Sequence, residues 1–90
     1  MLVIIGTVRF PVDRMAAARP AMARMIAASR NEDGCLGYAY AEDVLEPGLI
    51  HVVERWRDEA SLARHFASDH LAGWRAACAV VINAGVLTLI

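Results

Sequence analysis

The fold is decided by residues 35–56, whose sequence is CLGYAYAEDVLEPGLIHVVERW. Within it, residues 35–43 alternate between large and small side chains, as a strand with two different faces does. The large side chains are those of Leu36, Tyr38 and Tyr40. A turn signal at residues 46–48, Glu-Pro-Gly, separates them from a second strand pattern at residues 49–56. We therefore expect a β-hairpin in the middle of the chain.

Helical patterns flank this hairpin on both sides. Apolar residues recur at helical spacing over residues 15–29, where Pro20 predicts a kink or a restart of the helix. After the hairpin, Asp58 can cap a helix over residues 59–66. A further helix, beginning near residue 69, is expected to continue to about Cys78.

The two ends of the chain are apolar on both faces of the strands that they predict. Residues 2–10 and 79–90 are mostly apolar, which is typical of strands covered on both sides. The order strand, helix, strand, strand, helix, strand predicts one α+β domain of the ferredoxin-like βαββαβ type over residues 1–90. We expect a four-stranded antiparallel sheet with helices on one face. A second copy would cover the other face, giving a homodimer of the dimeric α/β barrel type.

Composition excludes several classes of function. The chain has 90 residues, 58% of them hydrophobic, and a net charge of −1. Its basic residues are scattered, which argues against nucleic-acid binding, and no apolar run is long enough to span a bilayer. The first residues lack the basic region of a signal peptide, so we expect a cytoplasmic protein. Cys35 and Cys78 are expected to be small reduced hydrophobes.

Glu54 and His65 are the candidate catalytic residues. Glu54 shares a strand face with Ile50, Val52 and Trp56. That apolar company places the carboxylate partly inside the protein, where it needs a hydrogen-bonding partner. His65 is a candidate partner, because the helix that carries it has to pack back over the sheet. The structural alternative is a paired buried glutamate that stabilises the hairpin.

Aromatic side chains provide candidate walls for a substrate pocket. Trp56 could stack on a flat aromatic molecule, or it could be ordinary core. Tyr38 offers the same two interpretations, although its hydroxyl needs a partner if buried. Trp74, on the last helix, is expected to be a core residue or a lid over the pocket.

The histidines do not suggest a metal site in the sequence. His65 and His70 are five positions apart, whereas two ligands on one face of a helix are spaced at i and i+4. His51 lies on the strand face opposite Glu54. A phosphate-binding glycine loop, a nucleophile elbow and a flavin site are not recognisable either. We therefore expect neither a metal nor another cofactor.

Two stretches resemble a known protein family. The first is residues 27–38, AASRNEDGCLGY, at the predicted junction between helix and strand. The second is residues 54–60, ERWRDEA, which is followed by Leu62, His65, Ser68 and His70. Together with the strand order, these stretches resemble the antibiotic biosynthesis monooxygenase family over nearly the whole chain.

The resemblance implies a dimeric ferredoxin-like fold with a pocket between the helices and the sheet. Members of the family oxygenate aromatic polyketides or quinols without metal or flavin, and relatives degrade haem or isomerise a sugar phosphate. The haem-degrading branch has an asparagine on the first strand, where this chain has Thr7, so haem is disfavoured. The polyketide-oxidising branch has an asparagine four residues before the strand tryptophan, where this chain has Val52.

The leading hypothesis is a cofactor-independent monooxygenase that uses dioxygen to oxidise a small aromatic or quinol-type substrate. In this hypothesis His65 takes a proton from the substrate and Glu54 orients His65. The expected substrate-binding residues are Trp56, Tyr38, Phe66, His70 and Trp74. Two alternatives stay open, because a fold does not define a function. One is a non-catalytic, small-molecule-binding or stress-related dimer, and the other is an isomerase that uses the same acid–base pair.

Overall fold

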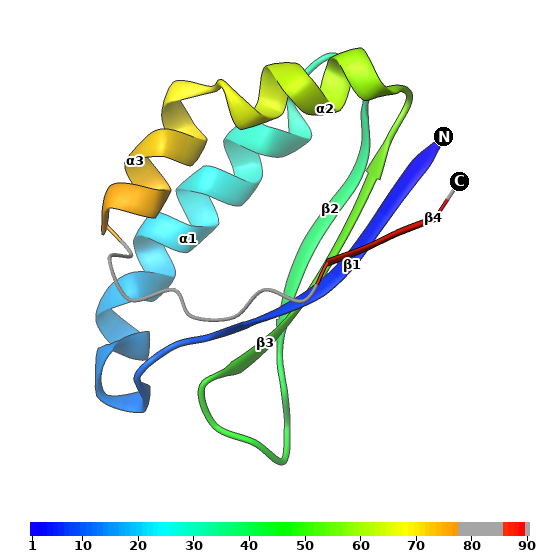
Figure 1. Ribbon diagram of the computed structural model, residues 1–90. Coiled ribbons are helices and arrows are strands. Elements are labelled where there is room, and N and C mark those ends of the chain that lie inside the picture. Colours follow the sequence, from blue (N-terminus) through cyan, green and yellow to red (C-terminus); the bar gives the residue numbers. More distant parts are fainter. Residues whose placement is uncertain (78–85, 90) are drawn as a thin grey trace.

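The computed structural model describes residues 1–77 and 86–89. Its elements in chain order are β1 (Leu2–Arg9), a short 3₁₀ turn η1 (Val12–Arg14), α1 (Met15–Arg30), β2 (Cys35–Glu42), β3 (Leu49–Trp56), α2 (Glu59–Phe66), α3 (Asp69–Ala77) and β4 (Val86–Leu89). The three helices lie together on one side of the sheet, as Figure 1 shows. In the part of the chain that is described, no helix is both long and apolar enough to cross a membrane.

The sheet is antiparallel with the strand order β2-β3-β1-β4. Strand β3 is paired on both sides: Glu54 lies opposite Ile4 of β1 and opposite Tyr38 of β2. This register brings Glu54 and Tyr38 side by side beneath the helices. Strand β4 pairs with β1. The rest of the strand expected at residues 79–90 lies outside the described residues.

Strand β3 has the two faces that its sequence predicts. Its buried residues are Ile50, Val52, Glu54 and Trp56, which alternate with the exposed His51, Val53 and Arg55. The buried set faces the helices, because the helices cover this side of the sheet. The prediction that Glu54 and Trp56 share the covered face, and that His51 lies on the other, is confirmed.

Strand β2 departs from simple alternation at its beginning. Its pairing with β3 shifts register between Cys35 and Gly37, which is the mark of a β-bulge. Cys35 therefore packs against the core, while Leu36 is about half exposed. The prediction that Leu36 shares a face with Tyr38 is wrong, because the extra residue inverts the alternation on one side of the bulge.

Helix α1 runs without interruption through Pro20, so the predicted restart does not occur. Its buried residues are Met15, Met22, Met25 and Ser29, which recur at helical spacing. The Ser29 hydroxyl donates a hydrogen bond to the Met25 carbonyl at 2.8 Å, so this buried polar group is satisfied inside its own helix.

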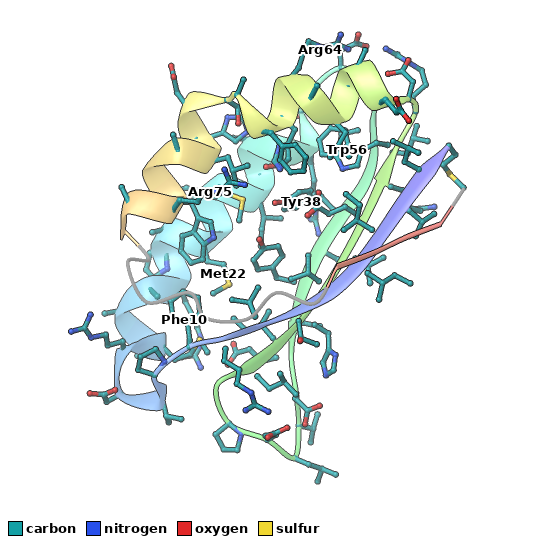
Figure 2. The ribbon with its side chains drawn as sticks, viewed as in Figure 1. Phe10, Met22, Tyr38, Trp56, Arg64 and Arg75 are labelled. Atoms are coloured by element: carbon teal, nitrogen blue, oxygen red, sulfur yellow. The ribbon has the colours of Figure 1, made fainter. Side chains whose placement is uncertain are left out.

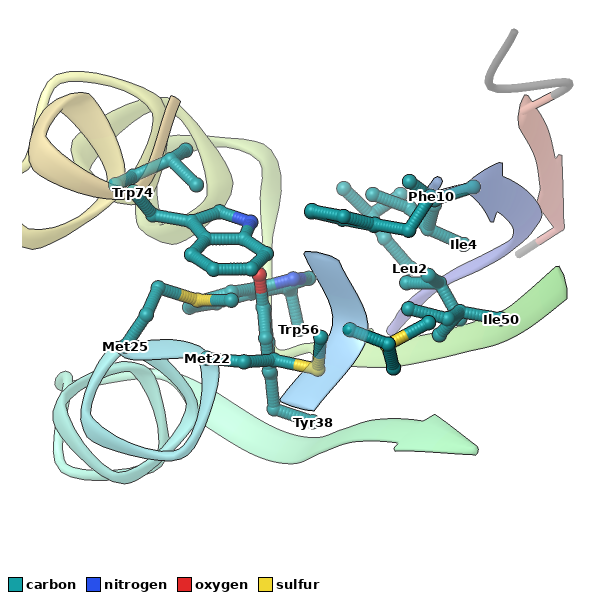
Figure 3. Packing of buried hydrophobic residues seen from close by; sticks show 13 residues of the cluster. Leu2, Ile4, Phe10, Met22, Met25, Tyr38, Ile50, Trp56 and Trp74 are labelled. Atoms are coloured by element: carbon teal, nitrogen blue, oxygen red, sulfur yellow. The ribbon is translucent and has the colours of Figure 1, made fainter. Parts of the chain in front are cut away.

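The hydrophobic core lies between the helices and the sheet. Trp74 of α3 packs against Phe10, with ring centroids 5.5 Å apart, and the thioethers of Met22 and Met25 fill the space beside the indole, as Figure 3 shows. Trp56 lies deeper and is fully buried. The core thus encloses the covered face of β3, on which Glu54 is located.

Within residues 1–77 and 86–89, no helix covers the opposite face of the sheet (Figure 1). Ile5 of β1 and Val53 of β3 are neighbours in the strand pairing and are each about two-fifths exposed. Large apolar side chains side by side on an uncovered sheet are typical of an interaction surface. The domain therefore has one face that holds its core and a second face on which Ile5 and Val53 are exposed beside His51 and Arg55.

Candidate active site

Glu54 is a buried carboxylate with a defined partner. The indole N–H of Trp56 donates a hydrogen bond to Glu54 Oε1 at 3.0 Å, from two residues further along the same face of β3. Burial raises the pKa of the Glu54 carboxyl, while the Trp56 hydrogen bond and the His65 imidazole act in the opposite direction. Trp56 is therefore a hydrogen-bond donor to the site as well as a core residue.

His65 is almost completely buried, with 1% of its side chain exposed. It is held by helix α2, which begins at its cap residue Asp58: the Ser61 N–H donates to Asp58 Oδ1 at 2.8 Å. His65 Nδ1 lies 2.6 Å from Glu32 Oε2, whereas His65 Nε2 lies 4.0 Å from Glu54 Oε1. The expectation that Glu54 orients His65 is therefore corrected: the group in hydrogen-bond contact with the imidazole is Glu32.

Glu32 reaches this position through a tight turn after α1. Gly34 in this turn has φ +88°, a conformation that side chains rarely adopt, and a Cβ there would overlap the Ser61 hydroxyl. The turn therefore packs directly on α2. The sequence of residues 31–34, Asn-Glu-Asp-Gly, predicts a turn that ends the helix and does not by itself assign Glu32 to the site. The signal that could have pointed to Glu32 is a buried histidine that needs a carboxylate.

His70 joins the same carboxylate from helix α3. Its Nε2 lies 2.8 Å from Glu32 Oε2, so one oxygen atom is shared by two imidazoles. The i and i+4 spacing rule does not apply to His65 and His70, because they lie on different helices: α2 ends at Phe66 and α3 begins at Asp69, as the sequence predicts. The donor atoms of Glu32, His65 and His70 lie within 4.8 Å of one another, an arrangement that could hold a metal ion.

The imidazole of His65 is surrounded by rings. Its ring centroid lies 4.7 Å from Trp56, 5.2 Å from Tyr38, and 6.0 Å from both Phe66 and His70. Tyr38 is buried, and burial raises the pKa of its phenol. Figure 2 shows Tyr38 and Trp56 between the helices and the sheet. The residues predicted for the site from β2, β3 and α2 thus converge on one histidine.

Two of the predicted wall residues lie elsewhere than expected. Phe66 is 51% exposed, so it lies at the outer edge of the cluster rather than enclosing it. Trp74 is buried against Phe10 in the core, which favours the core interpretation of this residue.

Arg75 is a site residue that the sequence interpretation missed. Its guanidinium carbon lies 5.8 Å from the centre of the Phe66 ring, a cation–π geometry. Its positive charge also lowers the pKa of Glu54, although less than the Trp56 hydrogen bond does. Arg75 lies one turn of α3 beyond Leu71. Its position in the sequence relative to His70 does not predict that it belongs to the site.

A cavity of about 430 Å³ lies along β2. It is lined by residues 35–39 of the strand together with Arg30 and Arg55. Arg30 Nε donates to the Tyr38 carbonyl at 2.8 Å. Tyr38 is a predicted site residue that borders this cavity, whereas His65 is not among its lining residues.

Taken together, the fold and the site define an α+β ferredoxin-like domain with a carboxylate–imidazole cluster buried among aromatic rings. Residues 1–77 match the family model described as antibiotic biosynthesis monooxygenase. Because this match covers most of the chain, the protein belongs to the antibiotic biosynthesis monooxygenase family.

Solved structures with this fold come from several bacteria. A Pseudomonas aeruginosa protein is 31% identical with a TM-score of 0.83. The match covers 98% of this chain and 90% of the Pseudomonas aeruginosa chain. A Mycobacterium tuberculosis protein is 27% identical with a TM-score of 0.85. The match covers 99% of this chain and 92% of the Mycobacterium tuberculosis chain.

Among curated sequences, an uncharacterized Synechocystis protein is 29% identical over 69 residues. These residues are 77% of this chain and 47% of that relative, so the chain spans about half the length of the curated relative that it matches.

Proposed function

We propose that this domain is a cofactor-independent monooxygenase that oxidises a small aromatic or quinol-type substrate between the helices and the sheet. The observation that carries the proposal is the position of the His65 imidazole. It contacts Glu32 through Nδ1, faces Glu54 with Nε2 and is surrounded by aromatic rings. An imidazole backed by a carboxylate is suited to take a proton from a phenol. The surrounding rings suit a flat, electron-rich substrate.

In the proposed reaction, His65 accepts the phenolic proton and the substrate becomes its anion. The anion gives one electron to dioxygen, and the resulting radical pair combines to form a carbon–oxygen bond at the ring. The His65 imidazolium returns the proton to the peroxide, which then loses water and leaves a quinone. One oxygen atom of dioxygen enters the product and the other leaves as water, so the substrate supplies every electron.

Each residue near His65 has a role in this proposal. Glu32 holds the Nδ1 side of the imidazole, and Glu54 faces its Nε2 side. Trp56 and Tyr38 form the inner walls, while Phe66 and His70 border the outer edge, where His70 is partly exposed. The role of Glu54 is therefore electrostatic, since it stabilises the imidazolium that forms after proton transfer.

Oxygen consumption with a panel of hydroquinones and naphthohydroquinones tests the proposal. The rate is measured in EDTA and corrected for autoxidation of each quinol without protein. We expect His65→Ala to lower the protein-dependent rate by about 10²–10⁴-fold. Glu59→Ala is the control, because Glu59 is exposed in the first turn of α2 and lies outside the proposed interface, and its rate should equal that of the wild type. Uptake at the autoxidation rate across the panel would exclude the oxygenase.

A non-catalytic binding domain is the alternative that one observation favours. Every buried side-chain nitrogen and oxygen atom in the described residues has a hydrogen-bond partner, which is what a purely structural network requires. In that case an aromatic ligand should bind, as judged by quenching of tryptophan fluorescence, without oxygen consumption. An isomerase using the same imidazole would also consume no oxygen, but it would convert its substrate.

The proposal includes a homodimer formed through the uncovered face of the sheet. Ile5 and Val53 contribute apolar surface there, and burying it against a second copy is favourable at about 25 cal/mol per Å² of apolar area. Such a dimer closes two sheets face to face and leaves the helix side of each copy open to substrate. The cytoplasmic location stays a prediction from the sequence.

A further inference from the structure

Three metal-binding side chains converge from three separate parts of the fold. Glu32 comes from the turn after α1, His65 from α2 and His70 from α3. Glu32 Oε2 lies 2.6 Å from His65 Nδ1 and 2.8 Å from His70 Nε2. Both imidazole nitrogens thus contact one carboxylate oxygen, and the three possible donor atoms lie within 4.8 Å of one another.

This donor set is one that divalent transition metals prefer. Two histidines and a glutamate bind zinc in sites that leave a fourth position open, with bonds of about 2.0–2.2 Å. In a tetrahedral site with such bonds, neighbouring donor atoms are about 3.3 Å apart. The Glu32 carboxylate would therefore have to move away from the imidazoles by roughly half an ångström when an ion binds. Its location in a turn, rather than inside a helix, allows that movement.

The surroundings of His65 also suit a metal ligand. If Nδ1 binds the ion, Nε2 is left facing Glu54 Oε1 at 4.0 Å. At this distance Glu54 adds negative charge beside the metal-binding histidine and does not hydrogen-bond to it. Glu32 and Glu54 together place two acidic groups beside the imidazoles, which favours a cation. The side chains of His70 and Glu32 are 27% and 16% exposed, so an ion can enter from solvent.

We propose that Glu32 Oε2, His65 Nδ1 and His70 Nε2 form a binding site for a divalent transition metal, with Zn²⁺ as the preferred ion. The site goes beyond the oxygenase function. A bound ion occupies the imidazole that the proposed reaction uses, so the metal acts as an inhibitor and not as a cofactor.

The test is titration of the EDTA-treated, dialysed full chain with Zn²⁺ by isothermal calorimetry, in the absence of any substrate. We expect one ion per chain. Co²⁺ should give the visible absorption bands of a four-coordinate site and should be displaced by Zn²⁺. His70→Ala should weaken Zn²⁺ binding on the order of 100-fold, and Glu32→Gln should weaken it similarly. His51→Ala is the matched control and should bind as the wild type does.

If Glu32→Gln fails to fold, His70→Ala alone tests the site. His70 is partly exposed, and circular dichroism can verify that the His70→Ala variant is folded. Zn²⁺ binding weaker than about 100 µM by the wild type, a free energy of roughly −5.5 kcal/mol, would overturn the site. Unchanged binding by His70→Ala would overturn it as well, as would equal losses in His70→Ala and His51→Ala. Because no substrate is present, these outcomes are independent of the oxygen measurements made in EDTA.

Discussion

Glu32 and His65 are 33 positions apart in the chain, and the Glu32 Oε2 atom lies 2.6 Å from His65 Nδ1. The same oxygen atom contacts His70. One carboxylate thus joins the end of α1 to α2 and α3, which makes it a structural link between the helices as well as part of the candidate site.

Removing this carboxylate should destabilise the fold. Glu32→Ala leaves a buried imidazole without its acceptor, so we expect the free energy of unfolding to fall by about 2–3 kcal/mol in urea denaturation. Glu59→Ala is the control, because Glu59 is exposed in the first turn of α2, and it should change stability by about 0.5 kcal/mol or less. Equal stability of the two variants would contradict the link.

The hydrogen bond between Trp56 and Glu54 should contribute separately from the volume of the indole. Trp56→Phe removes the hydrogen-bond donor of the buried Glu54 Oε1. We expect this to lower the free energy of unfolding by about 1–3 kcal/mol beyond the loss of packing. Trp74→Phe makes the same truncation elsewhere in the core and supplies the packing term. Urea denaturation of both variants gives the difference, and equal losses would show that the hydrogen bond contributes little.

Trp56→Ala is a poor test of substrate binding, although the sequence interpretation assigned Trp56 to a pocket wall. The side chain is fully buried, so its truncation should cost about 3–5 kcal/mol and impair folding before it affects a ligand.

The turn that positions Glu32 should not tolerate a side chain at Gly34. Gly34→Ala forces a Cβ into the Ser61 hydroxyl at a positive φ, and we expect it to lower stability by about 2 kcal/mol or more. Gly73→Ala, in helix α3 where no described residue lies within 4 Å of the added Cβ, should instead raise stability by up to about 1 kcal/mol. Thermal unfolding of the pair should give shifts of Tm in opposite directions.

The cap of α2 should make stability depend on acid pH. Hydrogen bonds from the Ser61 hydroxyl and the Ser61 N–H lower the pKa of Asp58 from 3.8 to about 2. Because the folded state has the lower pKa, the ionised cap contributes fully above about pH 4 and loses its contribution as the pH falls towards 2. Asp58→Ala should therefore have a lower Tm than the wild type at pH 7, with a smaller difference at pH 2.

Asp58→Asn separates the cap from its charge, because asparagine is also a good cap residue. Its Tm should lie above that of Asp58→Ala at pH 7 and should not show the same loss between pH 4 and 2. A constant difference between Asp58→Ala and the wild type over this range would contradict the assignment.

The uncovered sheet face should determine the state of association. Light scattering at micromolar concentration should report about twice the chain mass of 9.8 kDa. Val53→Asp places a charge opposite the apolar Ile5 in the proposed interface and should shift the mass to that of one chain. Val44→Asp, in the exposed hairpin turn, should leave the dimer intact. A wild-type protein that is monomeric and soluble would exclude this interface.

The sequence by itself determined the hairpin, the faces of β3 and the cap of α2, because these features depend on side-chain periodicity and on residues a few positions apart. It therefore placed Glu54 and Trp56 on the covered face and His65 on the helix above them. The bulge in β2 was not predictable in this way, since it depends on how one strand pairs with another.

Only the tertiary structure decided which carboxylate holds His65. Glu32 belongs to a turn with no apolar periodicity, and its contact with His65 and His70 depends on how the end of α1 packs against two later helices. A sequence pattern describes each helix separately, whereas distances of 2.6 and 2.8 Å between helices are set by packing. The cluster of Glu32, His65 and His70 therefore follows from the tertiary structure and not from the sequence pattern.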